Sequence, residues 1–378
     1  MKLRGTQIIH IFSRLLVGLV FIFSGFVKGI DPLGTAYRLE DYFIAWDAQF
    51  MMPLALTLSV LLCTMEFVLG VVVLLNLKPK TNAWILLVVM SFFTLLTLND
   101  AIYNPVPDCG CFGDAIKLTN WQTFYKNVVL MVFALILFGM RKKANDKAGN
   151  IVAYGTASMV ALLFISLSIY CYRHLPVIDF MDWKTGNKMY VENPQPVKYY
   201  LIYRNKESGE TREYLSPDYP YNDSVWMTQW EYVDTRIEDP NSFKGHDLQI
   251  IDSLGSDLTD VIIRNPDYQF ILVAWDLESA NQKSLSDVNV LAQKAEAAGL
   301  GFVALTSTLP AAVNALSLQL NLQYDFYQAD DITLKTMVRA NPGLLLLKNG
   351  IVIDKWHYND FPDYESFESR YLVNSKDK

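Results

Sequence analysis

The chain has 378 residues, 52% of them apolar and only 19% charged, a length that suits about two domains. Its net charge of −7 is modest, and it has no Lys/Arg-rich stripe of the kind that follows a phosphate backbone, which argues against nucleic acid as a partner. The long apolar runs end at about residue 174, and Asp, Glu, Pro and Asn become frequent after it. The sequence therefore predicts a membrane half followed by a soluble half.

Five stretches approach the roughly 20 apolar residues that a bilayer core requires. They are 7–28, 52–77, 82–101, 120–140 and 150–171. No small-x-small cleavage site follows the first stretch, so we expect it to remain as a membrane helix rather than to be removed as a signal peptide.

The segment after the first span, "DPLGTAYRLEDYFIAWDAQF" (31–50), is too charged to cross the membrane. Its Tyr37, Tyr42, Phe43 and Trp46 are spaced as in a short amphipathic helix lying in the membrane interface. An ordinary loop is the alternative.

Basic residues next to short loops predict the orientation, because they are retained on the cytoplasmic side. They all fall on one side of the five spans: Lys2, Arg4, Lys78, Lys80, Arg141, Lys142, Lys143 and Lys147. The "CGCFG" loop and the soluble half then share the other side. In a bacterium this predicts an inner (cytoplasmic) membrane protein with a cytoplasmic N-terminus and a periplasmic C-terminal domain, in a compartment where disulfides persist.

The soluble half divides into two parts by pattern. Residues 175–245 are β-rich and irregular, with a hairpin in "VKYYLIYRN" and "ETREYLS", and residues 246–378 alternate strands with helices. The expected strands are "DLQIID", "QFILVAW", "GFVALT", "YDFYQA" and the closing pair "GLLLLKNG" and "IVIDKW", with helices at about 281–299 and 309–320. The expected domains are thus a membrane domain of four helices (1–145), a fifth transmembrane helix (146–174), a β-rich extension (175–245) and an α/β domain (246–378).

The last of these domains resembles the thioredoxin-like α/β fold. Pro342 in "RANPGLLLL" lies just before the penultimate strand, where that fold places a cis-proline, and the closing hairpin is also similar. Where thioredoxin-like oxidoreductases carry Cys-x-x-Cys this chain reads "AWDLESANQKS", and no cysteine follows Cys171. The domain is therefore expected to dock, bind or support rather than to exchange disulfides. The expected partner-binding residues are Trp226 and Trp230 in the aromatic-rich part before this domain, and Trp275 and Pro342 within it.

The membrane half resembles the DoxX/MauE-type family of four-helix membrane proteins. The residues that carry the resemblance are "SRLLVGLVFIFSGFVKGIDPLG", "CTMEFVLGVVVLL" and "PDCGCFGDAIKLTNWQTFYKN", and the whole chain is similar to the long Bacteroidota-type members. The resemblance implies a four-helix bundle with thiol chemistry at the periplasmic face. MauE-type proteins are associated with assembly of the methylamine dehydrogenase small subunit, and related bundles include quinone-coupled disulfide generators of the vitamin K epoxide reductase type.

Cys109 and Cys111 are the expected exchanging pair. Gly110 between them permits the tight backbone that a Cys-Gly-Cys ring requires, and a disulfide in so small a ring is strained and easily reduced. A turn with two inert cysteines is the alternative interpretation. Cys171 ends the fifth span on the same side and is expected to resolve a mixed disulfide, if that helix packs near the loop.

Metal binding is a weaker alternative for the same cysteines. Cys109, Cys111, Cys171 and His174 would together make a Cys3His set, but their spacing is not that of a zinc finger, so no metal is expected. Cys63, in the middle of the second span, is expected to be an apolar-like residue of a helix interface.

Charges within spans are costly, which draws attention to Arg14 and Glu66. Counted from the cytoplasmic ends the two lie at similar depths, so we expect them to pair, and a proton or quinone site is the sharper alternative. Asp100, near the outer end of the third span, is a candidate proton acceptor close to the cysteine loop, with solvation or capping as the alternative. Arg14, Glu66 and Asp100 are therefore the expected cofactor-binding residues, with a quinone as the possible cofactor.

These features together predict an integral membrane protein that takes part in disulfide formation or relay to periplasmic or envelope client proteins. A thiol-disulfide oxidoreductase is the corresponding enzyme class. A membrane-anchored docking or assembly protein without enzymatic activity is the alternative, and a lipid or small-molecule carrier is a third interpretation.

Overall fold

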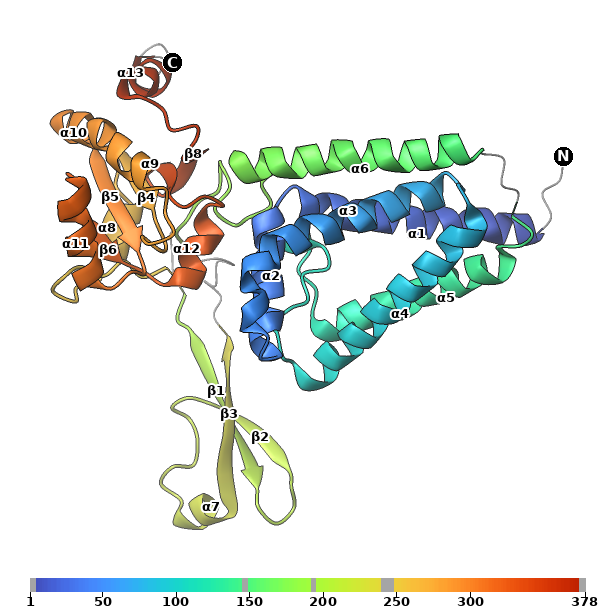
Figure 1. The fold of residues 1–378 in the computed structure, drawn as a ribbon. Coiled ribbons are helices and arrows are strands. Elements are labelled where there is room, and N and C mark those ends of the chain that lie inside the picture. The colour runs from blue at the N-terminus through green and yellow to red at the C-terminus, as the bar shows by residue number, and fades with distance from the viewer. Residues whose placement is uncertain (1–4, 145–148, 192–194, 239–247, 374–378) are drawn as a thin grey trace.

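The computed structural model describes residues 5–144, 149–191, 195–238 and 248–373 (Figure 1). Five apolar helices are long enough to cross a membrane, and a soluble part with two sheets follows them. The helices are α1 (Gly5–Gly29), α3 (Ala55–Leu74, preceded by the short helix η1, Gln49–Leu54), α4 (Pro79–Tyr103), α5 (Asn120–Met140) and α6 (Asn150–Arg173). The predicted fold class is therefore confirmed.

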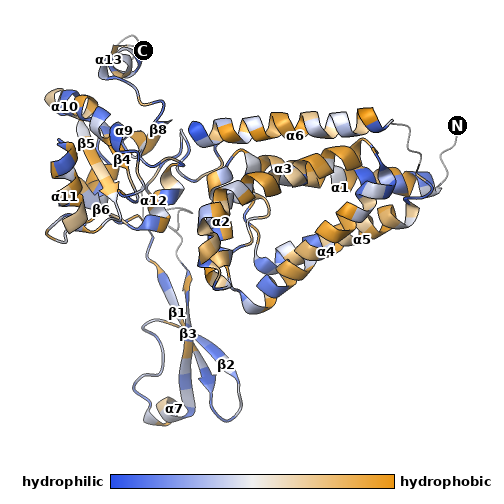
Figure 2. Ribbon diagram, viewed as in Figure 1, coloured by the Kyte–Doolittle hydropathy of each residue, from blue (hydrophilic) through white to orange (hydrophobic). Residues whose placement is uncertain are grey.

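Apolar residues dominate these helices along their whole length, whereas the soluble part is mixed (Figure 2). Such helices imply a lipid bilayer around the bundle. The C-terminal end of α1, the start of α3 and the end of α6 lie together at the end of the bundle that faces the soluble part, called here the soluble-domain end. Lys2, Arg4 and Lys147, which entered the predicted orientation, lie outside the described residues.

Close packing of α1 against α3 rests on three glycines. A Cβ atom on Gly25 would lie 2.6 Å from the backbone nitrogen of Phe67, and one on Gly70 would lie 2.7 Å from the backbone nitrogen of Ile22. Gly18 is similarly close to Leu74. Small residues let two membrane helices approach to backbone contact, where packing rather than the hydrophobic effect holds them together.

The charged segment after α1 forms a helix, as predicted. Helix α2 (Pro32–Ala45) begins at Asp31, whose carboxylate accepts a hydrogen bond from the backbone N–H of Gly34, and Pro32 fits the first helical turn. The helix packs over the start of α3, where Tyr42 and Phe43 are buried. It thereby closes one side of the bundle at the soluble-domain end.

Helices α4 and α5 pack against each other. Helix α6 packs on α3, on the side of the α1–α3 pair that faces away from α4 and α5 (Figure 1). The Phe67 and Phe164 rings stack at 4.3 Å where α3 meets α6. The bundle therefore has α6 on its outside, away from α4 and α5.

The larger soluble sheet has the strand order β6-β5-β4-β7-β8. Strands β4 (Tyr268–Val273), β5 (Gly301–Thr306) and β6 (Phe326–Gln328) are parallel, and β7 (Gly343–Lys348) and β8 (Ile351–His357) are antiparallel. This is the βαβ unit plus closing hairpin that the sequence pattern predicts, and the Asn341–Pro342 peptide bond just before β7 is cis.

Six short helices accompany this sheet. They are α8 (Thr259–Ile263), α9 (Gln282–Asp287), α10 (Asn289–Ala297), α11 (Pro310–Leu320), α12 (Asp331–Met337) and α13 (Tyr364–Phe367), which the π-helical turn Glu368–Val373 follows. The predicted helix 281–299 is divided at Val288. The predicted strand "DLQIID" is wrong: Ile251 forms only isolated bridges to Asp257 and Gln328, because the segment turns back at once.

A second sheet of order β2-β1-β3 projects from the soluble part (Figure 1). It consists of β1 (Lys198–Asn205), β2 (Thr211–Leu215) and β3 (Trp230–Glu238), with α7 (Ser224–Gln229) before β3. The segment before β1 packs against the five-stranded sheet instead: its Trp183 and Met189 are fully buried in the core of that sheet. The domain boundaries given above stay a prediction.

A methyl group at the α1–α3 contact should destabilise the bundle. We expect Gly25→Ala to lower the free energy of unfolding by about 1–3 kcal/mol, because the added carbon meets the backbone of α3. Gly155→Ala in α6 is the matched control: nothing lies within 4 Å of its added carbon, and alanine favours a helix. Thermal unfolding in detergent measures both, and equal stability of the two variants would contradict the role of Gly25.

Candidate functional site

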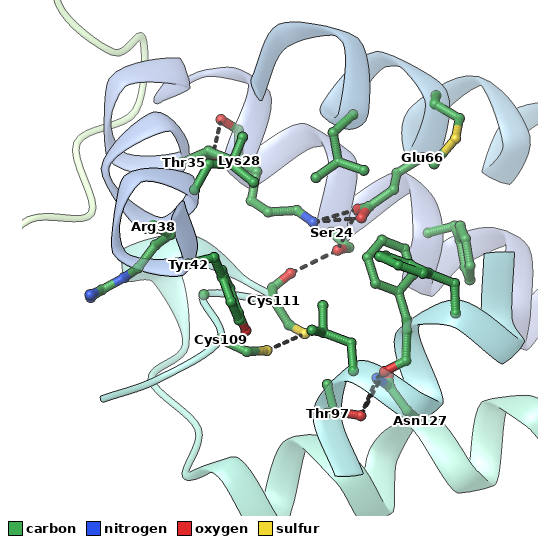
Figure 3. Close-up of a pocket in the computed structure, with 18 of the residues that line it drawn as sticks. Ser24, Lys28, Thr35, Arg38, Tyr42, Glu66, Thr97, Cys109, Cys111 and Asn127 are labelled. Atoms are coloured by element: carbon green, nitrogen blue, oxygen red, sulfur yellow. Dashed lines mark hydrogen bonds and ion pairs between the residues drawn. The ribbon is translucent and has the colours of Figure 1, made fainter. Parts of the chain in front are cut away.

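A cavity of about 520 Å³ lies between α1, α2, α3, α4, α5 and the loop that carries the two cysteines (Figure 3). Most of its wall is apolar, and the polar groups gather at the soluble-domain end. Its apolar lining includes Val20, Phe21, Leu39, Leu58, Leu61, Met65, Phe92, Phe93, Leu96 and Leu130.

The cavity has an open side on the membrane surface of the bundle. Leu61 and Met65 of α3 and Phe92 of α4 line it, and their side chains are 54%, 37% and 57% exposed. Since α3 and α4 are membrane-spanning helices, these exposed apolar side chains face lipid. An apolar molecule dissolved in the bilayer therefore has a route into the cavity.

Cys109 and Cys111 lie side by side in the cavity wall. Their Sγ atoms are 2.8 Å apart, and both residues are free thiols of intermediate exposure. Gly110 has φ of +61°, the left-handed conformation that the sequence analysis expected to turn the chain between them. The Asp108 carboxylate accepts a hydrogen bond from the Gly110 N–H at 2.9 Å, which stabilises the turn.

The environment of the pair favours a thiolate on Cys111. Its pKa is lowered to about 6, first because the Cys109 thiol donates a hydrogen bond to it and then because Lys126 and Lys28 lie near, while burial acts in the opposite direction. The same hydrogen bond, with burial, raises the pKa of Cys109. The pair is thus polarised: one thiol is ready to attack and the other holds its proton.

A buried ion pair lies beside the cysteines. Lys28 Nζ is 2.6 Å from one carboxylate oxygen of Glu66 and 2.7 Å from the other, and the two side chains are only 8% and 5% exposed. The Ser24 hydroxyl lies between this pair and the loop, 2.9 Å from Glu66 Oε2 and 2.7 Å from the Cys111 carbonyl oxygen. The pair thereby connects α1, α3 and the cysteine loop (Figure 3).

The predicted Arg14–Glu66 pair is wrong. Arg14 donates a hydrogen bond to the Leu74 carbonyl at the opposite end of the bundle, and it does not line the cavity. The two helices are antiparallel, and the Gly25–Phe67 contact shows that Glu66 is level with the last turns of α1, more than two turns beyond Arg14. The sequence analysis placed both charges at one depth because it counted each from an approximate span end.

Asp100 reaches the site through Tyr42. The Tyr42 hydroxyl lines the cavity and donates a 2.6 Å hydrogen bond to Asp100 Oδ2, and Asp100 is fully buried. Burial and this contact raise the pKa of Tyr42. Within the described part of the chain, the second carboxylate oxygen of Asp100 has no hydrogen-bond partner.

The structure does not bring Cys171 to the pair. Cys171 is buried at the end of α6, which packs on α3 away from α4 and α5, and it does not line the cavity. The expected resolving role of Cys171 needed α6 beside the loop, and the helix lies elsewhere. His174 contacts Asp360 at 2.8 Å, and the described residues contain no group of three or more potential metal ligands. Cys63 is buried in α3 as predicted.

Three of the four predicted partner-binding residues belong to cores. Trp226 and Trp230 stack with ring centroids 6.0 Å apart in the core of the three-stranded sheet, and Trp275 is part of the core of the five-stranded sheet. Trp226 and Trp230 therefore serve core packing, whereas Trp275 also lines a cleft beside α2, and a role of these residues in partner binding stays a prediction. Pro342, just before β7, is also buried.

Sequence reasoning missed Lys28, Ser24, Arg38 and Lys126. Arg38 Nη2 donates to Asp108 Oδ2 at 2.9 Å, so α2 holds the loop from one side, and Lys126 lies over the Phe112 ring. Lys28 had a signal: it is a cation in the last turn of an apolar span, on the same helix side as Ser24. Arg38 and Lys126 carried none, since they resemble ordinary residues of helix ends.

Comparison with known proteins agrees with the helical architecture. Residues 6–140, from α1 to the end of α5, match the family described as methylamine utilisation protein MauE. Residues 6–140 are thus similar to this family, and they are called here the MauE-type domain. The cavity and both of its cysteines therefore lie within the MauE-type domain, while α6 and the soluble part lie outside the match.

A curated protein is also similar to this chain. It is Protein TlpB of Flavobacterium psychrophilum, which is 26% identical over 142 residues. The aligned part covers 37% of this chain and 35% of TlpB, so about a third of each protein is matched. The MauE-type domain is thus supported by a family match, and the likeness to TlpB is partial.

Cys111 should be alkylated at a lower pH than an ordinary thiol. We expect its rate to rise with a midpoint near pH 6, where the thiolate forms. Cys109→Ala removes the hydrogen bond to the thiolate and should move that midpoint upward, whereas Cys63→Ala should leave it unchanged. Mass spectrometry of labelled peptides reads Cys111 alone, and a midpoint in the ordinary range for thiols would contradict the polarised pair.

Breaking the buried ion pair should destabilise the MauE-type domain. Lys28→Met or Glu66→Gln leaves one uncompensated group in an apolar site, so each should cost about 3–5 kcal/mol of unfolding free energy. Lys28→Met combined with Glu66→Leu should recover most of the loss. Lys117→Met is the control, because its ion pair with Asp182 is exposed and should be worth under about 1 kcal/mol.

Proposed function

We propose that this protein is a membrane-bound thiol oxidase that forms or relays disulfides for client proteins, with Cys109 and Cys111 as the exchanging pair and a quinone as electron acceptor. The observation that carries the proposal is the position of the pair in the wall of an apolar cavity whose open side faces the membrane. Water-soluble thiols and a lipid-soluble oxidant then meet at the same two sulfur atoms.

The cavity suits a quinone in size and chemistry. A volume of about 520 Å³ lies within the usual range for small-molecule sites, which are mainly apolar with a few placed polar groups. Phe93, Leu96 and Leu130 would pack against the ring and tail, and the Lys28 ammonium is the candidate donor at the cysteine end, since the Tyr42 O–H already donates to Asp100. A bound quinone would itself be the two-electron oxidant.

The proposed chemistry balances in two exchanges. A client dithiol reduces the Cys109–Cys111 disulfide: one S–S bond forms in the client, the pair becomes two thiols, and no electrons leave the system. The two thiols are then reoxidised to the disulfide, and their two electrons and two protons convert one quinone into one quinol. The low pKa of Cys111 makes it the thiolate of the second exchange.

Proton transfer has a candidate acceptor beside the pair. Tyr42 connects the cavity with Asp100, whose second carboxylate oxygen has no hydrogen-bond partner in the described structure. Glu66 is less suited, because Lys28 and Ser24 both bind it. We assign Asp100, through Tyr42, as the group that takes up the Cys109 proton when the disulfide re-forms and then passes it on to the reduced quinone, so that both protons end on the quinol.

The proposal includes the orientation that the basic residues predict. Lys80, Arg141 and Lys143 follow or begin helices at the bundle end away from the soluble part, which supports a cytoplasmic location of that end. The cysteine loop and a thioredoxin-like soluble domain would then face the periplasm from the inner membrane. The soluble domain lacks cysteines, so its proposed role is to support the pair and hold the client.

A quinone assay tests the proposal. Protein in lipid nanodiscs, supplied with a reduced dithiol peptide and a short-chain quinone, should consume one quinone for each peptide disulfide formed. Cys109→Ser and Cys111→Ser should each abolish turnover, and Cys171→Ser, remote from the cavity, should retain it. Quinone loss that continues without Cys111, or none in the unmodified protein, would overturn the proposed oxidase.

A non-enzymatic docking protein is the second candidate. An open cleft of about 770 Å³ between α2 and the soluble domain favours it, with Tyr37, Trp275, Asp276, Ser279 and Thr308 in its wall. In that case the Cys109→Ser/Cys111→Ser double variant would support the same assembly in cells as the unmodified protein.

A further inference from the structure

We infer that Arg339, a residue of the soluble α/β domain, is a positioning residue that fixes the cysteine loop of the membrane domain through Asp114. Asp114 lies three residues after Cys111. The inference concerns the site of the proposed function and rests on that function only in taking the two thiols as reactive. The inference adds that the soluble domain, which has no cysteine, completes the cysteine site of the membrane domain.

Arg339 contacts two membrane-domain carboxylates at once. Its Nε lies 2.9 Å from Asp31 Oδ2 and 3.1 Å from Asp31 Oδ1, and its Nη2 lies 2.8 Å from Asp114 Oδ2. The Arg339 side chain is only 7% exposed. Burial alone would lower its pKa, but the two carboxylates raise it, so the group is a permanent cation that no change of pH within the physiological range releases.

The planar guanidinium is also held from its own domain. Nη1 donates to the Lys335 carbonyl at 2.5 Å, and the Tyr37 ring of α2 lies 5.7 Å from the guanidinium carbon. All three nitrogen atoms of the guanidinium therefore donate hydrogen bonds. Such a rigid fork suits the fixing of two carboxylates at a set separation, which the single ammonium of a lysine cannot do.

Asp31 and Asp114 connect this contact to the reactive site. Asp31 begins α2, the helix whose Arg38 holds Asp108 just before Cys109. Asp114 follows the turn closed by the Gly113 N–H to Gly110 carbonyl hydrogen bond. Arg339 thus holds the far end of the same loop whose near end is held by Arg38.

The loop has three side-chain tethers near its cysteines, and one of them comes from the soluble domain. Arg38 binds Asp108, Ser24 binds the Cys111 carbonyl, and Arg339 binds Asp114. The Cys111 thiol owes its reactivity to Cys109, Lys126 and Lys28, with Glu66 opposing them, so its state depends on the loop lying where it does. Loss of the third tether should release the half of the loop that carries Cys111.

A double-variant titration tests the inference. Arg339→Gln and Asp114→Asn should each raise the alkylation midpoint of Cys111, by on the order of one pH unit, and the two changes together should raise it no further. A purely electrostatic effect would give opposite signs, because Asp114→Asn removes a negative charge near the thiol. Lys294→Gln is the control: it removes a cation from an exposed ion pair with Glu365 elsewhere in the soluble domain and should leave the midpoint unchanged.

Three results would overturn the inference: a midpoint that Asp114→Asn lowers or leaves unchanged, additive effects of the two changes, or an equal shift in the Lys294→Gln control. If Arg339→Gln does not fold, Asp114→Asn still decides, because it alters only the loop side of the contact. The readout contains no quinone. A failed quinone assay together with shifted midpoints would therefore overturn the proposed oxidase and keep the role of Arg339.

Discussion

The site depends on one buried ion pair, Lys28–Glu66. Two opposite charges removed from water at the contact of α1 and α3 must stay together, because either one alone would be costly in an apolar surrounding. The pair sets the relative depth of the two helices at their closest approach. Through Ser24 it also holds the Cys111 carbonyl, and through Lys28 it adds positive charge near the thiol. Helix packing, loop position and thiol reactivity thus share one interaction.

The sequence predicted the elements better than their contacts. Local composition and periodicity were enough to predict the five apolar spans, the helix after Asp31 and the order of strands and helices in the soluble sheet. Tertiary contacts change mainly the ends of such elements. Cys109 and Cys111 were found because a left-handed glycine between two cysteines is a local feature. The quinone and the client remain proposals, since neither leaves a local pattern.

Contacts between distant segments were predicted poorly for a physical reason. The partner of Glu66 depends on how far α1 is shifted along α3. Arg14 lies level with Leu74 at the end of α3, and this shift places Lys28 rather than Arg14 beside Glu66. Tryptophans drew attention as binding residues, yet an aromatic side chain buries so much area that a core is its usual place, as for Trp226 and Trp230. The Arg339–Asp114 contact joins positions 225 residues apart and has no trace in local sequence.

The soluble domain is joined to the bundle by the covalent chain and by side-chain contacts, of which the buried contacts of Arg339 reach the cysteine loop. Helix α6 leads through a short segment into the core of the five-stranded sheet, where Trp183 and Met189 are buried. Such a connection keeps the domain at an effective concentration on the order of millimolar beside the loop. A contact too weak to hold two separate proteins would therefore keep this domain docked most of the time. The covalent connection thus favours re-forming of the contact, whereas the bonds of Arg339 to Asp31 and Asp114 set how long the contact lasts.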